Sequence, residues 1–459
     1  MDDTADPFAA IDGTDLDFSD IHSGFTIGGN WQENWDTSVA NEAWGYLRLE
    51  VDKANSLMDS YSHISSMESI LQSESTATTA QFELVGVTME SARFIDSRLP
   101  IPIVSMEGIG EFLKAIWDII KRVVSGIWNA IKNFFRWIFT SSTVHTAKEA
   151  ELRMRIQALM KKPHRAKHSV TRIALSRNDN MVFSRTDVHT GSANNPLKTI
   201  SMIDKVSEVV FKGVSETIED SGEAIQRGLK DMLGKDAVGI MLAIKTILDA
   251  IERKTIYQSL SSVLTFNVVS VDENVETIVS HEVSNGYRFR GYRLKNGSNI
   301  VSLKESKDTL LIRALLSFEF SREGEKEYDE TREFGKIDLP PLHGALDYLN
   351  YCDRARKYID DFDGRFVHGV FPKLDKGISD AGNHLVGRQN ADNETAEVKV
   401  RIKDALSFYT VITKSIYSGP VAFAKYVNET REAAHGIASS ILTHYEAIKD
   451  ETFNKSGPY

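Results

Sequence analysis

The sequence predicts an α+β fold that is predominantly α, in which a long amphipathic helix precedes a C-terminal helical bundle with an antiparallel β-meander insert. Two observations carry this prediction: helical periodicity over most of the 459 residues, and one alternating stretch, 261–305, dense in Val, Thr, Ile, Tyr and Phe. An apolar content of 41% is enough for a substantial core, and the length favours two or three domains.

The first expected region, 1–107, is an acidic leader that resembles a propeptide. It contains nineteen Asp and Glu and four Lys and Arg, a net charge of −15. Residues 1–40 are typical of a flexible arm, and short helices are expected at about 41–75 and 80–94. The first twenty residues lack the basic and apolar segments of a signal peptide. The single cysteine, Cys352, excludes a disulfide framework and fits a reducing cytosol.

The second expected region, 108–163, contains a long basic amphipathic helix and a following helix at 144–160. Apolar residues recur at spacings of three and four, which marks one stripe of a helix that should be nearly continuous over 109–138. At about 1.5 Å per residue such a helix is roughly 50 Å long, more than one small domain needs. The stripe consists of Ile109, Leu113, Ile116, Ile120, Val123, Ile127, Ile131, Phe134 and Ile138.

The apolar stripe needs a partner, and two interpretations stay open. One is packing against the chain's own core or against another subunit; the other is a helix that lies in a membrane surface, with Trp and Phe opposite basic residues. A membrane-spanning helix is excluded because charged residues recur throughout. The candidate partner or membrane face consists of Ile116, Trp117, Ile120, Val123, Ile127, Ile131 and Phe134.

Basic residues are concentrated directly after the leader. Residues 112–178 contain fourteen Lys and Arg and three acidic residues, and the tract 161–177 is the densest part. Such asymmetry points to a polyanion such as DNA, an anionic surface, or an acidic segment that masks a basic one, although both faces could simply be solvated. Residues 164–196 are polar and are expected to form a linker.

The last expected region, 197–459, is a helical domain with a β-insert at about 261–321. Helix is expected over 197–258 with breaks near Gly222 and Gly234. Hairpin turns are expected at Asn285-Gly286 and Asn296-Gly297, because Asn-Gly tolerates positive φ. Helices follow at about 342–362, 365–387, 394–416 and 419–450, with Pro420 in the first turn of the last one.

The sequence contains no recognisable catalytic, cofactor-binding or metal-binding constellation. The histidines do not form HExxH or another spaced ligand set, and no GxxxxGK[ST] loop is present. Cys352 lies in a Tyr-rich helical segment, where a packed thiol is more common than a nucleophile. The sequence therefore predicts a protein that is not an enzyme and needs no cofactor, with an enzyme that has an unrecognised site as an alternative.

Three short triplets recur in the acidic leader: Ser66-Met67-Glu68, Thr88-Met89-Glu90 and Ser105-Met106-Glu107. One interpretation is helix capping, since Ser followed three positions later by Glu is a capping pattern. The other is proteolytic processing after Glu68, Glu90 and Glu107, because proteases cut short motifs in accessible segments. The last triplet lies where the charge of the chain changes sign, which favours processing.

A Ser-Met-Glu triplet followed at once by GIGEFLKAIWDIIKRVVSGIWNAIKNFFRWIF resembles the internal head proteins of large tailed phages of the phiKZ-like jumbo type. The run 398–446 is also similar to their terminal helices, so that the resemblance covers 66–139 and 398–446. It implies a prohead protease that cuts after small-x-Glu triplets. The triplets that end at Glu68 and Glu107 match this pattern, and the one that ends at Glu90 departs from it at Thr88.

The resemblance implies a non-enzymatic structural protein of a phage virion, made in the host bacterial cytoplasm and packaged inside the capsid. Expected partners are other virion proteins, further copies of the chain, the prohead protease, packaged DNA through 161–177, and a membrane surface. Proteolytic maturation at Glu107 would remove the leader and leave a mildly basic protein. Ejection with the genome is a further hypothesis, and a membrane-active protein that acts on the host bilayer is the alternative.

Overall fold

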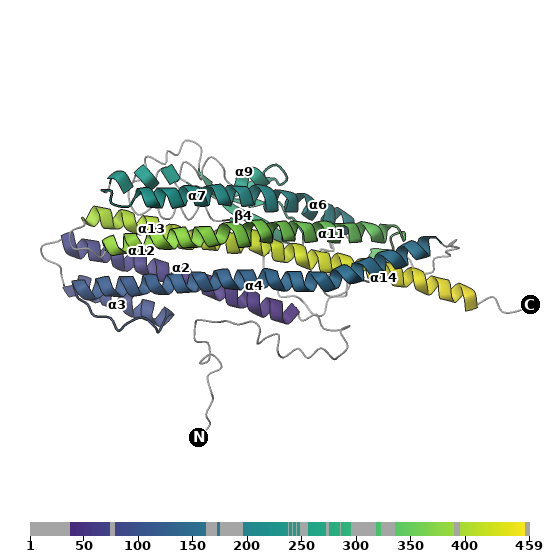
Figure 1. Ribbon diagram of the computed structural model, residues 1–459, viewed down its shortest axis with the longest axis horizontal. Coiled ribbons are helices and arrows are strands. Elements are labelled where there is room, and N and C mark those ends of the chain that lie inside the picture. The colour runs from purple at the N-terminus through teal and green to yellow at the C-terminus, as the bar shows by residue number, and fades with distance from the viewer. Residues whose placement is uncertain are drawn as a thin grey trace, which may run out of the picture.

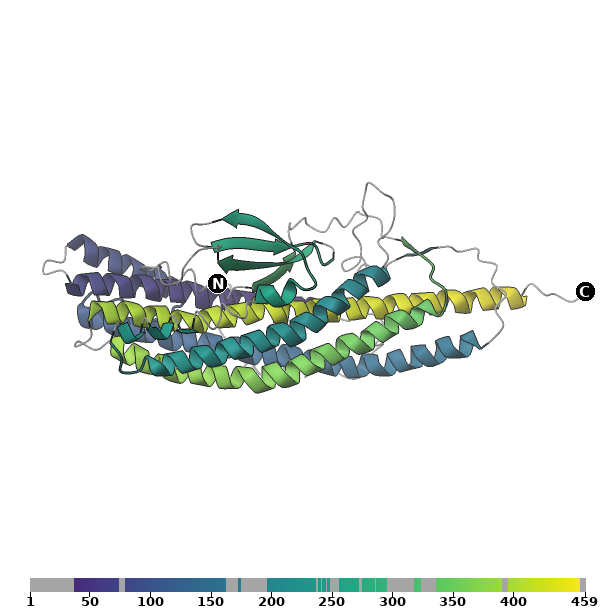
Figure 2. The ribbon, with the colours of Figure 1, turned by 90° about the horizontal axis from the view of Figure 1, so that it is seen from above.

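The protein is an elongated helical bundle with a small sheet attached to one side, as Figures 1 and 2 show. The structure is a computed structural model. It describes residues 37–73, 79–161, 172–174, 196–236, 238–240, 242–244, 246–247, 256–271, 275–284, 286–294, 318–322, 336–389 and 395–454. The predicted α+β class, predominantly α, is confirmed.

The described part of the acidic region contains the helices α2 (Thr37–Ser73) and α3 (Thr79–Ile95). They correspond to the helices expected at about 41–75 and 80–94, although α2, with 37 residues, is longer than the short helices expected of this region. Its apolar residues recur at helical spacing from Leu47 to Leu71 and are buried, so α2 is part of the core. Residues 1–36, expected to form a flexible arm, lie outside the described residues.

Helix α4 (Met106–Met160) is a single helix of 55 residues, about 80 Å long at 1.5 Å per residue. The prediction of a continuous helix over 109–138 is confirmed, but the expected second helix at 144–160 is its continuation. Gly126 does not interrupt α4. The helix begins at Ser105, which is the N-cap: its Oγ accepts a hydrogen bond from the Gly108 amide at 3.1 Å.

Three further rods each contain a π-helical turn. They are α6 (Pro196–Glu208), η1 (Val209–Val214) and α7 (Ser215–Asp231); α11 (Gly344–Phe362), η3 (Asp363–Val370) and α12 (Phe371–Gln389); and α13 (Ala396–Ile416), η4 (Tyr417–Val421) and α14 (Ala422–Asn454). The expected loops at 363–364 and 417–418 are therefore π-turns. Pro420 lies inside η4 rather than in a first turn.

The predicted break near Gly222 is also wrong, because Gly222 lies within α7. The break near Gly234 is confirmed: this residue has a φ of 76°, and the chain turns there after α7. A short helix, α9 (Ile256–Leu260), leads into the sheet.

The predicted meander is an antiparallel sheet with the order β2 (Phe266–Val271), β3 (Val275–Ser280), β4 (Tyr287–Leu294) and β5 (Phe318–Arg322). Gly286 adopts a φ of 83° in the turn before β4, as predicted, and the Tyr287 amide donates to the Ser284 carbonyl at 2.8 Å. The second predicted turn, Asn296-Gly297, lies outside the described residues.

A second, two-stranded sheet joins distant parts of the chain. Strand β1 (Arg172–Ala174), inside the expected linker 164–196, pairs with β6 (Lys336–Asp338), and Ile173 lies opposite Ile337. Side chains from α2 through α14 form one contiguous hydrophobic core, from Leu47 to Leu442. The expected boundary at residue 107 thus falls between helices that share this core.

Candidate processing sites and the buried polar cluster

The triplet Ser105-Met106-Glu107 lies at an exposed junction between an extended segment and α4. Residues 100–104 have no helix or strand structure, and the side chains of Ile101 and Ile103 are 73% and 64% exposed. Glu107 is exposed in the first turn of α4. Helix ends open at low free-energy cost, so the bond between Glu107 and Gly108 is accessible to a protease after one turn frays.

Gly108 lets the extended segment lie against the beginning of α4. A Cβ atom at this position would be 2.3 Å from the carbonyl oxygen of Ile103, far closer than two such atoms can approach. This contact could not be predicted from the sequence, because it depends on the path of the preceding segment. The residue after the candidate cleavage point is thus fixed as glycine by packing.

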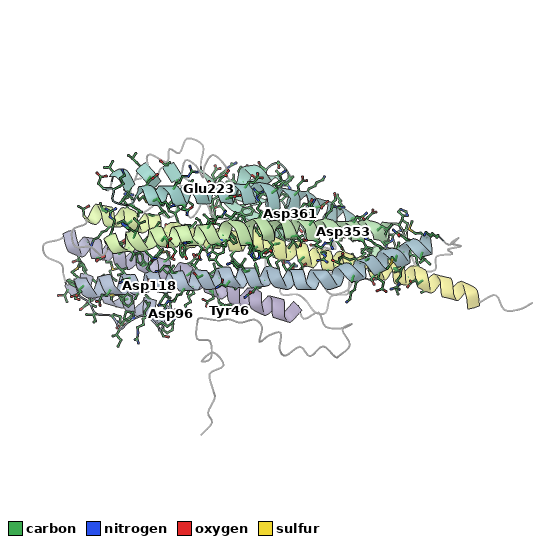
Figure 3. The ribbon with its side chains drawn as sticks, in the orientation of Figure 1. Tyr46, Asp96, Asp118, Glu223, Asp353 and Asp361 are labelled. Atoms are coloured by element: carbon green, nitrogen blue, oxygen red, sulfur yellow. The ribbon has the colours of Figure 1, made fainter. Side chains whose placement is uncertain are left out.

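An ion-pair cluster fixes the chain where it leaves α3. The Asp96 carboxylate pairs with Lys53 of α2 at 2.9 Å and with Arg98 at 2.7 Å. Burial alone would raise the pKa of Asp96, but its hydrogen bonds with Arg98 and Lys53 hold the pKa well below its usual range. Figure 3 shows Asp96 beside the α2–α4 part of the bundle. The exposed segment therefore begins at an anchored point.

The triplet Ser66-Met67-Glu68 has the same three residue types in the opposite environment. It lies inside α2, where the Glu68 side chain is 2% exposed. The Lys403 ammonium of α13 donates to Ser66 Oγ at 2.8 Å, and the Gln389 amide of α12 donates to Ser65 Oγ. A protease cannot reach the bond after Glu68 without removal of α2 from the core.

Glu90, the third candidate, is exposed on α3, while Met89 is buried beneath it. The backbone is helical on both sides. Since proteases bind substrates in extended form, a cut here requires local unfolding of α3. The structure thus separates the three candidates into one at an exposed helix end, one on a helix surface and one in the core.

The candidate partner or membrane face of α4 is buried against the chain's own helices. Among the described helices, none is long and apolar enough to cross a bilayer. In this conformation neither lipid nor a second protein can contact this face, because the chain's own helices cover it. Its residues, Ile116, Trp117, Ile120, Val123, Ile127, Ile131 and Phe134, are all at most 6% exposed.

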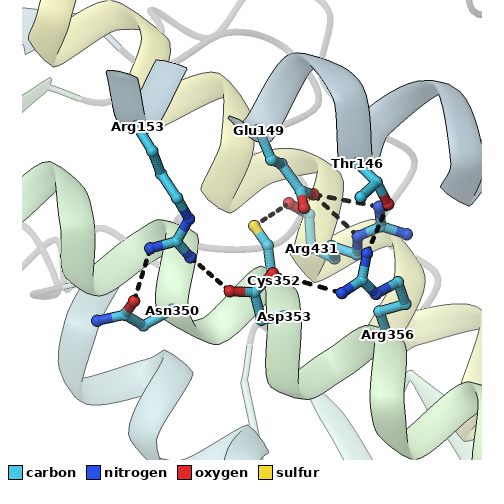
Figure 4. Close-up of polar contacts among 8 residues, drawn as sticks. All are labelled: Thr146, Glu149, Arg153, Asn350, Cys352, Asp353, Arg356 and Arg431. Carbon is cyan, nitrogen blue, oxygen red and sulfur yellow. Dashed lines mark hydrogen bonds and ion pairs between the residues drawn. The ribbon is translucent and has the colours of Figure 1, made fainter. Parts of the chain in front are cut away.

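Polar side chains of α4, α11 and α14 form a buried cluster around Cys352 (Figure 4). The Arg431 guanidinium pairs with the Glu149 carboxylate at 3.1 Å, and both side chains are almost fully buried. The Cys352 thiol donates to the Arg431 carbonyl at 3.4 Å. Burial raises the pKa of this thiol well above its usual value, so it stays protonated and is a poor nucleophile.

Two arginines extend this cluster. Arg153 donates to Asn350 and pairs with Asp353 at 2.6 Å, and Arg356 donates to Thr146 Oγ1 at 2.6 Å. These pairs tie the distal half of α4 to α11. Within the described residues, no group of His, Cys, Asp and Glu is arranged to hold a metal ion. The cluster thus joins these helices through ion pairs and hydrogen bonds.

A family model of phiKZ-like phage internal head proteins matches residues 49–263. The resemblance predicted from the sequence is thereby confirmed. The matched region includes all three triplets and α4, and it ends before β2. It does not extend to residues 398–446, so the similarity predicted there stays a prediction. No curated protein and no solved structure matches the chain.

The match covers just under half of the chain and shows a similarity to structural proteins that are located inside the phage capsid. A structural role in this family also favours a protein without enzymatic activity. The family description does not assign a role to individual residues.

Proposed function

We propose that this protein is an internal head component that the prohead protease cuts after Glu107. The observation that carries the proposal is the position of Ser105-Met106-Glu107 at the end of an exposed, extended segment. Exposed connections are the preferred sites of proteolysis, because the chain can adopt the extended conformation that a protease binds. The net charge of the chain changes sign at this point. A cut here therefore breaks the covalent link between the acidic helices and α4.

The membrane-active alternative is less well supported. The residues that would enter a bilayer are in the core, and α4 would have to leave the bundle to expose them. Liposome co-sedimentation of the full-length protein tests this alternative. Binding that is lost in Ile120→Asp, while the fold stays stable, would favour a membrane role.

We propose in addition that the basic tract 161–177 contacts packaged DNA. In this tract Arg172 is exposed and pairs with Asp338 at 3.2 Å. Binding through phosphate contacts weakens steeply with salt, by a slope that follows the number of contacts. Replacement of Lys161, Lys162, Arg165 and Lys167 by Ala should therefore reduce both affinity and salt slope in a titration with duplex DNA. An unchanged slope would contradict the proposal.

Mass spectrometry of purified particles tests the cleavage directly. Trypsin produces the peptide Leu99–Lys114 from the uncut chain, and Gly108–Lys114 from a chain cut after Glu107. The proposal expects the shorter peptide in mature particles and the longer one in immature particles. Mature particles that contain only Leu99–Lys114 would contradict cleavage at this site.

A further inference from the structure

Helix α2 lies antiparallel to both α4 and α13. Trp44, near the beginning of α2, contacts Phe134 of α4 and stacks on Tyr417, the first residue of η4 directly after α13, with ring centroids 5.9 and 4.8 Å apart. Seventeen residues later in the chain, Tyr61 contacts Trp117, which is far closer to the beginning of α4. Figure 1 shows α2 alongside α4. Helix α2 therefore packs along α4 and α13, which both follow the candidate cleavage site; the surface of α4 and α13 that α2 covers is called here the α4–α13 groove.

The buried side of α2 is mainly apolar. Leu57, Met58, Tyr61 and Ile64 are 0% exposed, and Leu47, Val51 and Ala54 are at most 4% exposed. The buried apolar side chains of α4 and α13 belong to the same contiguous core. Burial of apolar surface is the main favourable contribution to association. The same contribution that stabilises a core helix therefore binds α2 to the rest of the bundle.

Polar contacts fix the register of α2 in the groove. The Tyr61 hydroxyl donates to Gln389 Oε1 at 2.8 Å, and the Gln389 amide in turn donates to Ser65. Lys403 donates to Ser66, and the Lys425 ammonium lies 5.6 Å from the centre of the Trp44 ring. None of these contacts involves the segment between α3 and α4, which a cut after Glu107 would open.

We infer that the fragment 1–107 stays bound after cleavage, so that the processed protein is a complex of two chains. This inference rests on the proposed cleavage after Glu107. The partner of the α4–α13 groove is then the chain's own acidic fragment, and the complex keeps the whole chain's net charge of −11. Retention of α2 also protects the bond after Glu68, because this residue stays in the core.

Quantitative mass spectrometry of mature particles separates retention from cleavage. The tryptic peptide Ala54–Arg93 covers most of α2 and α3, including Glu68 and Glu90. We expect it in a molar ratio of about one to Gly108–Lys114, the product of the cut. Gly108–Lys114 without Ala54–Arg93 would overturn retention and leave the cleavage intact. Leu99–Lys114 alone would overturn the cleavage, and with it the two-chain complex.

An experiment with purified protein tests the groove itself. A recognition sequence for a specific protease replaces residues 100–104 in the full chain, and the cut protein is analysed by size-exclusion chromatography. We expect the two fragments to co-elute and to separate only in denaturant. Fragments that separate in native buffer would overturn the inference.

A matched pair of variants on α2 controls for the site of attachment. Leu57→Asp places a charge on the buried side, and Leu49→Asp places one at a position that is 68% exposed. After the cut, the first variant should release the fragment or reduce its recovery in the complex at least tenfold, and the second should retain it. Equal retention of the fragment in both variants would overturn the groove as its binding site. If Leu57→Asp does not fold before the cut, Leu57→Ala replaces it with the same expected order.

Discussion

The triplets at 66–68 and 105–107 contain identical residues and have opposite accessibility. Glu68 is 2% exposed in the middle of a 37-residue helix, while Glu107 is exposed where an extended segment enters α4. Ser66 is bonded to Lys403 of a distant helix, whereas Ser105 caps the helix that it begins. A short motif therefore specifies what a protease can recognise, and the tertiary structure determines which copy it can reach.

The largest expected effect is on cleavage at the exposed triplet. Glu107→Gln removes the charge of the residue before the bond and should abolish the Gly108 terminus in particles. Glu68→Gln should leave the cleavage pattern unchanged, because the folded chain already protects that bond. Peptide mass spectrometry of particles assembled with each variant measures both. A loss of cleavage in Glu68→Gln would show that the buried triplet is processed before folding.

A second prediction makes the buried triplet accessible by unfolding. Ile120 is fully buried in α4, and Ile120→Asp removes apolar contacts and places a charge in the core. This change should cost about 3–5 kcal/mol of unfolding free energy. Asn129→Asp, on the exposed side of the same helix, should change the unfolding free energy by less than about 0.5 kcal/mol.

Denaturant unfolding and incubation with the head protease provide the two measurements for this pair. Ile120→Asp should yield a new product that begins at Ser69, and Asn129→Asp should yield only the product that begins at Gly108. A stable Ile120→Asp protein without the Ser69 product would mean that the core does not protect Glu68.

The sequence predicted elements whose signal is local. The residues from Ile109 to Ile138 share one face of α4, as the spacing of three and four predicted, whereas the sequence left open that the chain's own core buries this face. Gly286 was identified because positive φ strongly favours Gly and Asn. Both signals lie within a few residues of the feature that they determine.

Features that depend on distant residues were not predictable. The bond between Ser66 and Lys403 joins positions 337 residues apart, and neither residue type indicates the other. Continuity through Pro420 was missed because proline normally ends or kinks an α-helix. In η4 the π-turn accommodates the proline within the rod. The same limitation applies to the triplets, whose burial follows from what packs around α2.

A third, smaller effect should follow from loosening the contacts of the buried triplet. Gln389 accepts from Tyr61 at 2.8 Å and donates to Ser65. Gln389→Leu removes both bonds and leaves the buried Tyr61 hydroxyl without this acceptor, at a cost of about 1–3 kcal/mol. Limited proteolysis should then release more of the Ser69 product. Ser56→Ala, which removes an exposed bond within α2, should leave its rate unchanged. Equal rates in both variants would contradict a role for Gln389 in protection.

The smallest expected effect distinguishes two ways in which Glu68 could become exposed. Either any loss of stability exposes it, or only a change near α2 does so. Gly286 has a φ of 83° in the turn before β4, remote from both triplets in sequence, and its amide donates to Glu282 at 2.7 Å. Gly286→Val should cost about 1–2 kcal/mol, because a side chain in the left-handed region contacts its own backbone and a β-branched residue has little freedom to avoid it. Gly286→Asn should cost less, since Asn adopts positive φ more readily.

Denaturant unfolding measures both costs, and limited proteolysis measures the Ser69 product. If protection of Glu68 is local to the α2 groove, Gly286→Val should release less of this product than Gln389→Leu at comparable stability. Equal release would mean that Glu68 is exposed only by global unfolding, and that α2 does not detach from its groove on its own.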